Sequence, residues 1–198
     1  MGSNALLMML AAHLRPYKRW EFVGVSAFQT GATIAFPSTA QAGDVAILSC
    51  TGTGSTAPSG WTQINAGSTN HWYRLCSGGE SSVASAVTGG GGAVTLFRPK
   101  GGLASFYTSV SDSPQTNRTI SLPAASACLI VGTGHTPSSV SWSGDPVMPS
   151  PYTTHIQVST NPALRVASSL PPIGTSTTGA MNINTPDIVR QQFCVFTL

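Results

Sequence analysis

The chain has 198 residues, of which only 8% are charged, and its formal net charge is +3. Roughly 25% of the residues of an ordinary globular protein are charged, so the polar surface of this chain must consist mainly of hydroxyl groups. Charge repulsion between free copies of the chain is correspondingly weak. The composition therefore favours a subunit of an assembly. Nine scattered Lys and Arg residues do not form a basic stripe, which argues against a nucleic-acid partner.

The first predicted element is a helix over residues 5–15. Residues 5–14, ALLMMLAAHL, are apolar at nine positions out of ten, Ser3 or Asn4 can cap the helix, and Pro16 ends it. Apolar side chains surround its axis, so it needs enclosure on every side, either between neighbouring subunits or over one end of its own domain. We expect residues 1–19 to form an attachment segment whose contacts with partners are made by Leu6, Leu7, Met8, Met9, Leu10 and Leu14.

This apolar run does not predict a membrane span or a signal peptide. A spanning helix needs about 20 apolar residues, and this run is shorter. The basic residues Arg15, Lys18 and Arg19 follow the run instead of preceding it, which is the reverse of a signal peptide. We therefore expect synthesis in the cytoplasm, with the three cations placed at a solvated helix end.

From Trp20 onward, short runs of β-forming residues are separated by clusters of Gly, Pro, Ser and Asn roughly every 8–12 residues. This spacing predicts an all-β domain over residues 20–198, an antiparallel β-sandwich of jelly-roll-like form. The expected strands are 21–28, 44–50, 61–65, 70–76, 82–87, 93–98, 104–109, 117–122, 127–133, 138–142, 154–159, 163–168, 179–184 and 190–197.

The two halves of this domain look faintly alike. The segments DVAILSCTGTG, GWTQI, HWYRLCS and AVTLFRP occur in the same order as ACLIVGTGHT, VSWSGD, LRVASS and FCVFTL. An internal duplication, the two sheets of one sandwich, or chance in a β protein rich in Gly and Ser accounts for this likeness. The four glycines at 89–92 precede a strand and not a helix, so we expect a flexible hairpin loop and no phosphate-binding loop.

The sequence contains no pattern that predicts catalysis, a metal site or a cofactor. The four cysteines lack C-x-x-C spacing and a histidine at ligand spacing, so we expect buried free thiols, with a Cys50–Cys76 bridge as the alternative. No serine has the G-x-S-x-G pattern. A histidine could meet a serine in space, but nothing in the sequence favours such a pair, and we do not expect an enzyme.

The stretch HWYRL, residues 71–75, carries the most informative aromatic residues. Alternation along a strand places Trp72 and Arg74 on one face and His71, Tyr73 and Leu75 on the other. If Trp72 is exposed beside Arg74, the pair forms a platform for a glycan. The alternative is that these rings fill the core.

Several of these segments together resemble a β-sandwich module of tailed-bacteriophage virion proteins. The segments that carry the resemblance are AGD at 42–44, the P-x-GW-T of residues 58–62, WYR at 72–74, the turn ending in Gly79 and Glu80, and the strand ending in Phe97 and Arg98. They cover residues 40–100. The helix over 5–15 is not part of the module.

The resemblance implies a non-enzymatic structural protein located in the virion, on the tail, on a fibre or on the capsid exterior, and synthesised in the cytoplasm of a bacterial host. Its partners would be other virion proteins and copies of itself, bound through the attachment segment. The alternative function is a glycan-binding module for host adsorption, with Trp72 and Arg74 contacting a glycan on the host surface.

Overall fold

The computed structural model describes residues 19–52, 56–64, 70–112, 118–123, 127–136, 146–149, 151–159, 163–171, 176–180 and 190–198, and its regular elements in these ranges are all β-strands. Every pair of strands is antiparallel. The expected all-β, antiparallel fold class is confirmed. The attachment residues Leu6 to Leu10 and Leu14 lie outside the described residues.

Two five-stranded sheets make up most of the structure. The first has the order β1-β7-β3-β5-β4 and contains Arg19–Val25, Gly92–Lys100, Val45–Cys50, His71–Leu75 and Thr62–Gln63. The second has the order β11-β12-β10-β14-β8 and contains Tyr152–Val158, Ala163–Ser169, Cys128–Thr136, Arg190–Thr197 and Ser105–Asp112. Two smaller sheets have two strands each and pair β2 with β6 and β9 with β13, over Thr33–Ala35, Ser82–Ala84, Arg118–Ile120 and Thr177–Gly179.

The strand order of the second half repeats that of the first. Adding seven to each strand number turns the sheet β1-β7-β3-β5-β4 into β8-β14-β10-β12-β11, and the pair β2-β6 into β9-β13. We call residues 19–100 the first repeat and residues 105–197 the second repeat. The described strands therefore form two copies of one seven-stranded unit.

The repetition extends to single residues at the sheet edges. In β1 the register shifts after Phe22, which pairs with Phe97, and in β8 it shifts after Phe106, which pairs with Phe196. The paired rings make edge-on contacts with centroids 6.0 Å apart in the first repeat and 5.6 Å apart in the second. Each repeat therefore has the same aromatic pair beside the same bulge.

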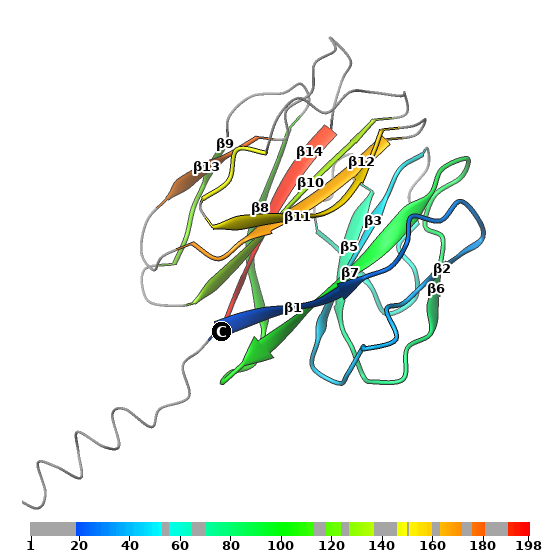
Figure 1. Ribbon diagram of the computed structural model, residues 1–198, viewed down its shortest axis with the longest axis horizontal. Helices are drawn as coiled ribbons and strands as arrows, with labels where there is room; N and C mark the ends of the chain where they lie inside the picture. Colours follow the sequence, from blue (N-terminus) through cyan, green and yellow to red (C-terminus); the bar gives the residue numbers. More distant parts are fainter. Residues whose placement is uncertain are drawn as a thin grey trace, which may run out of the picture.

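Among the described residues, three apolar clusters hold together the layers of strands that Figure 1 shows. One lies between the first five-stranded sheet and β2-β6, and its counterpart lies between the second five-stranded sheet and β9-β13. The third fills the interface between the two five-stranded sheets, where Val45, Ile47 and Phe97 of the first repeat meet Leu129, Val131 and Phe196 of the second. The small sheets thus flank the structure on opposite sides, and the two repeats face each other through their large sheets.

Burial on both faces explains the composition of the central strands. All six residues of β3 and all nine residues of β10 are buried. A strand covered on both faces is a continuous apolar run and not an alternating one, which is the pattern of VAILSC and of CLIVGT.

Most expected strands are present with shifted ends, and one observed strand was not expected. Strand β2 was missed because three residues carry little pattern, and the expected strand 138–142 lies outside the described residues. Gly90 and Gly92 of the glycine run serve close packing, since a Cβ atom on Gly90 would lie 1.5 Å from the Thr51 carbonyl oxygen and one on Gly92 would lie 2.7 Å from Cys50 Sγ. Neighbouring backbone leaves no room for a side chain there, which is a stronger requirement than loop flexibility.

Candidate functional site

The residues that carry the phage-module resemblance form structural contacts in the first repeat. Asp44, which is 1% exposed, precedes β3 and accepts two hydrogen bonds of 2.8 Å from the Arg98 guanidinium on β7. Its carboxylate also accepts the Gln41 backbone N–H at 2.9 Å. Because the carboxylate is buried with a two-pronged partner, this ion pair fixes the start of β3 against β7.

The second set of motif residues stabilises a turn after β5. Arg74 donates to Glu80 at 3.0 Å, and its guanidinium carbon lies 5.8 Å from the centroid of the Trp61 ring. Glu80 also accepts the backbone N–H groups of Ser77 and Gly78. Burial alone would raise the pKa of Glu80, but the Ser77 hydrogen bonds and the Arg74 charge outweigh it and lower the pKa.

The proposed glycan platform is absent. Trp72 is 0% exposed and packs in the cluster between the first large sheet and β2-β6, so neither ring face can stack on a sugar. The predicted alternation is confirmed, because Trp72 and Tyr73 pack in different clusters. Trp72 therefore fills the core, and Arg74 is held by Glu80 and Trp61.

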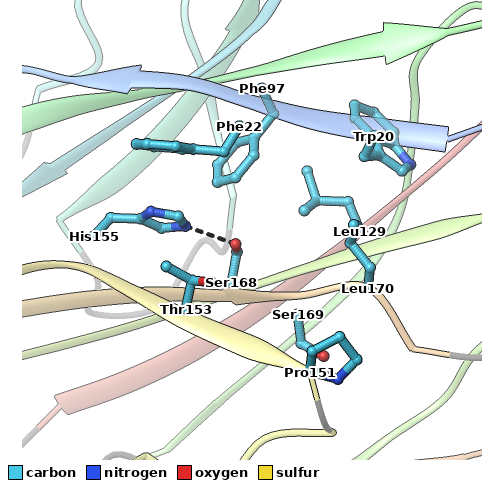
Figure 2. A pocket seen from close by; sticks show the side chains of 10 residues that line it. All are labelled: Trp20, Phe22, Phe97, Leu129, Pro151, Thr153, His155, Ser168, Ser169 and Leu170. Atoms are coloured by element: carbon cyan, nitrogen blue, oxygen red, sulfur yellow. Dashed lines mark hydrogen bonds between the residues drawn. The ribbon is translucent and has the colours of Figure 1, made fainter.

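A pocket of about 190 Å³ opens between the two repeats at the edges formed by β1 and β11 (Figure 2). Its lining combines apolar side chains with three hydroxyl groups and an imidazole. The lining residues are Trp20, Phe22, Phe97, Leu129, Pro151, Thr153, His155, Ser168, Ser169 and Leu170. No Lys, Arg, Asp or Glu is among these residues.

The hydroxyl and the imidazole in this pocket are in direct contact. His155 Nε2 lies 2.6 Å from Ser168 Oγ, and the His155 ring stacks on Phe22 with centroids 4.0 Å apart and an interplanar angle of 18°. Burial lowers the pKa of His155 to about 4. The imidazole is therefore unprotonated at neutral pH and able to accept a hydrogen bond from the serine.

A bulge in β11 aims His155 into the pocket. Thr154 pairs with Ala167 and Ile156 pairs with Val166, so His155 is the extra residue. As a result, the consecutive residues His155 and Ile156 both contact the interface between the repeats. Sequence reasoning missed the His155–Ser168 pair, because a residue separation of thirteen and an irregular register leave no local signal.

The equivalent place in the first repeat is filled by a tyrosine. Ile47 faces Tyr73 across β3 and β5, and Val131 faces Ser168 across β10 and β12. Val45 of β3 pairs with Phe97, and Leu129 of β10 pairs with the equivalent Phe196. Ile47 and Val131 each lie two residues further along these strands. Their partners Tyr73 and Ser168 therefore occupy equivalent positions in the two repeats. The pocket therefore lies where one repeat has a large side chain and the other has a small one.

The two ring arrangements are closely similar. The Tyr73 ring stacks on Phe106 at 13° and meets Phe196 edge-on at 74°. The His155 ring stacks on Phe22 at 18° and meets Phe97 edge-on at 73°. Hence the imidazole occupies the slot that the phenol occupies in the other repeat, and it reaches that slot from the neighbouring strand.

The other two described histidines also lie between the repeats. His71 and His135 have ring centroids 5.3 Å apart, and both side chains are buried. Burial, and then the proximity of His135, holds the pKa of His71 well below its usual value. Neither ring nitrogen of His71 has a hydrogen-bond partner among the described residues.

The remaining sequence expectations concern cysteines, metals and membranes. Cys50, Cys76, Cys128 and Cys194 are all buried and unbridged, as expected. Within the described ranges, no three His, Cys, Asp or Glu side chains are grouped to hold a metal ion. No helix in that part of the chain is long and apolar enough to cross a membrane.

Comparisons of the chain with protein-family models, with curated proteins and with solved structures found no match.

Proposed function

We propose that the chain is a structural protein of a tailed-bacteriophage particle, assembled on the tail, a fibre or the capsid exterior. Its role in the particle is structural and does not require catalysis. It attaches through residues 5–14 and through contacts with copies of itself and with other virion proteins. The helix over residues 5–15 belongs to this proposal.

Apolar side chains on a charge-poor surface are the observation that carries the proposal. Leu103 is 89% exposed, Leu75 is 53% exposed and Tyr107 is 47% exposed. Leu103 lies in the connection between the repeats, and Tyr107 lies on β8, one of the two edge strands of its sheet as described. Residues 105–111 of this edge carry no charge that would discourage pairing with another chain, and such edges and apolar residues are typical of surfaces covered by partners.

The contacts of the motif residues agree with this role. The ion pair of Asp44 with Arg98 and that of Arg74 with Glu80 stabilise strand ends and turns. A module that decorates many virion parts needs this kind of framework. The sandwich form belongs to the same proposal and is supported by the two large sheets, which face each other. The repeated strand order is an additional feature that the jelly-roll-like expectation did not include.

Glycan binding at Trp72 and Arg74 is not retained as a second function, because the Trp72 ring is buried and the Arg74 guanidinium is engaged.

Light scattering of the full-length chain tests the assembly part of the proposal. The wild-type chain should be oligomeric, and the double variant Leu7→Glu/Leu10→Glu should be smaller, because two charges cannot be buried between subunits without partners. Thr178→Glu adds a charge at an exposed position of β13 and should leave the mass unchanged. A monomeric wild-type chain with the solubility of the double variant would rule out attachment through residues 5–14.

Immunogold electron microscopy tests the location. Antibodies against the chain should label particles purified from lysates of the bacterium that encodes it. Particles that are never labelled would refute the assignment to a virion.

A further inference from the structure

We propose that Ser168 is a nucleophile activated by His155, and that the pocket between the repeats binds small neutral carboxylic esters whose acyl group passes to Ser168. This inference goes beyond the structural role and does not depend on it. The reactive pair, Ser168 and His155, belongs to the second repeat and lies outside residues 40–100, where the phage-module motifs occur, although Phe97 of those motifs also lines the pocket.

The contact geometry is that of a nucleophile and its base. Ser168 Oγ and His155 Nε2 are 2.6 Å apart, within the range of a strong hydrogen bond. With Nε2 accepting the hydroxyl proton, we assign the tautomer that carries its proton on Nδ1. Burial keeps the pKa of His155 at about 4, so the ring is in its basic form across the neutral range. Figure 2 shows the pair pointing toward each other at the pocket wall.

The departure from internal symmetry indicates that this place is specialised. Tyr73 of the first repeat closes the slot beside the aromatic pair of the second repeat and stacks on Phe106 with centroids 5.2 Å apart. In the second repeat Ser168 stands at the Tyr73 position, and the bulge at His155 moves an imidazole into the slot. Core packing alone is satisfied by the tyrosine arrangement. The serine and the bulge together produce a reactive hydroxyl, a base and an open volume of about 190 Å³.

The lining selects the substrate class. Phe22, Leu129 and Leu170 provide an apolar wall, which suits a short acyl chain or an aromatic leaving group. Because no charged side chain lines the pocket, an anionic phosphate or carboxylate would lose its hydration without compensation. Thr153 lies directly opposite Ser168 in the register of β11 and β12, and its hydroxyl is the donor available for the carbonyl oxygen.

The acyl transfer balances with the groups in the pocket. Ser168 Oγ attacks the ester carbonyl carbon and forms a C–O bond, while its proton passes to His155 Nε2. The tetrahedral intermediate collapses by breaking the bond to the leaving oxygen, which takes the proton from Nε2 and departs as an alcohol or phenol. The products are O-acyl-Ser168 and the alcohol. Hydrolysis requires a water molecule to reach His155 Nε2 in a small pocket that the acyl group then occupies, so the acylated serine should accumulate.

The test uses the full-length protein and 4-nitrophenyl acetate. We expect a burst of 4-nitrophenol release of one equivalent or less, an increase in intact mass of one acetyl group, and peptide mapping of that group to Ser168. Ser168→Ala should abolish the burst, and His155→Gln should slow it about 100-fold or more. Ser49→Ala is the matched control, because it removes a buried serine hydroxyl that has no hydrogen bond among the described residues, and it should retain the wild-type burst.

The pH dependence separates assisted attack from simple surface acetylation. The burst rate should be constant between about pH 5 and pH 8 and should fall below about pH 4, as His155 becomes protonated. Acetyl groups mapped on wild-type protein to lysines or to other hydroxyl groups would overturn the proposal, even if Ser168→Ala fails to fold. A rate that rises tenfold per pH unit, or an unmodified wild-type protein, would overturn it as well.

Discussion

Exchange of the two ring arrangements tests the equivalence of Tyr73 and Ser168 directly. The single variant Ser168→Tyr places a second ring in a slot already filled by His155, and overpacking of this kind costs about 2 kcal/mol. The single variant His155→Ala removes a ring stacked 4.0 Å from Phe22 and the hydrogen bond to Ser168, which together cost about 2 kcal/mol. In the double variant the new tyrosine ring can stack on Phe22 as Tyr73 stacks on Phe106. Its stability should lie within about 1 kcal/mol of the wild type, so the two changes should be coupled by about 3 kcal/mol.

Urea denaturation followed by tryptophan fluorescence gives the four free energies of unfolding in this cycle. All four proteins are compared at one concentration and at pH 7, because association would add to the apparent stability. The reverse change, Tyr73→Ser, provides a control, since it opens a cavity in the first repeat where no neighbouring imidazole can enter, and it should destabilise by about 3 kcal/mol. Additive effects of Ser168→Tyr and His155→Ala would show that the two rings do not share one slot and would refute the equivalence.

Two further predictions concern the histidines and the buried ion pair. Burial lowers the pKa of His155 to about 4 and that of His71 well below its usual value. Below about pH 6.5 these histidines are therefore protonated in the unfolded chain while they stay neutral in the folded chain. The free energy of unfolding should reach its full value above about pH 6.5 and fall at lower pH, with about 2 kcal/mol lost by pH 5 through His155 alone. Urea denaturation at pH 7 and at pH 5 measures this loss, and equal stabilities at the two pH values would contradict it. Asp44→Ala leaves Arg98 without its carboxylate and should cost about 3 kcal/mol in the same assay, and a loss below about 1 kcal/mol would show that the pair is not a structural element.

The large sheets could be predicted because their central strands carry a strong local pattern. The apolar runs VAILSC and CLIVGT mark β3 and β10, and the similar order of segments in the two halves already indicated a duplication or a pair of sheets. The structure favours the duplication, because strand order, bulge and aromatic pair all repeat. The pairing of strands distinguishes a duplication from the other interpretations. Pairing involves residues far apart in the chain, so the local sequence pattern does not reveal it.

The pocket could not be predicted, because its chemistry depends on an irregularity of register. In a regular strand, His155 and Ile156 would face opposite sides, and the bulge places both at one interface. Trp72 shows the same limit in another form. Alternation correctly separated it from Tyr73, but only the presence of the small sheet β2-β6 over that face decides that the ring is buried.

The duplication also explains how one interface can hold the repeats together and still carry a polar pocket. The centre of the interface is apolar, and at the edge where β8 lies over β5 the stacked Tyr73 and Phe106 rings close it. Stacked rings and buried apolar area stabilise the contact between the repeats at that edge. At the equivalent edge, formed by β1 and β11, the serine hydroxyl and the imidazole can therefore replace the tyrosine. The cost of that exchange is limited, because the His155 ring retains the stacking contact with Phe22, and Ser168 and His155 satisfy each other's hydrogen bond. The interface can therefore accommodate the proposed reactive pair at this edge at a limited cost in stability.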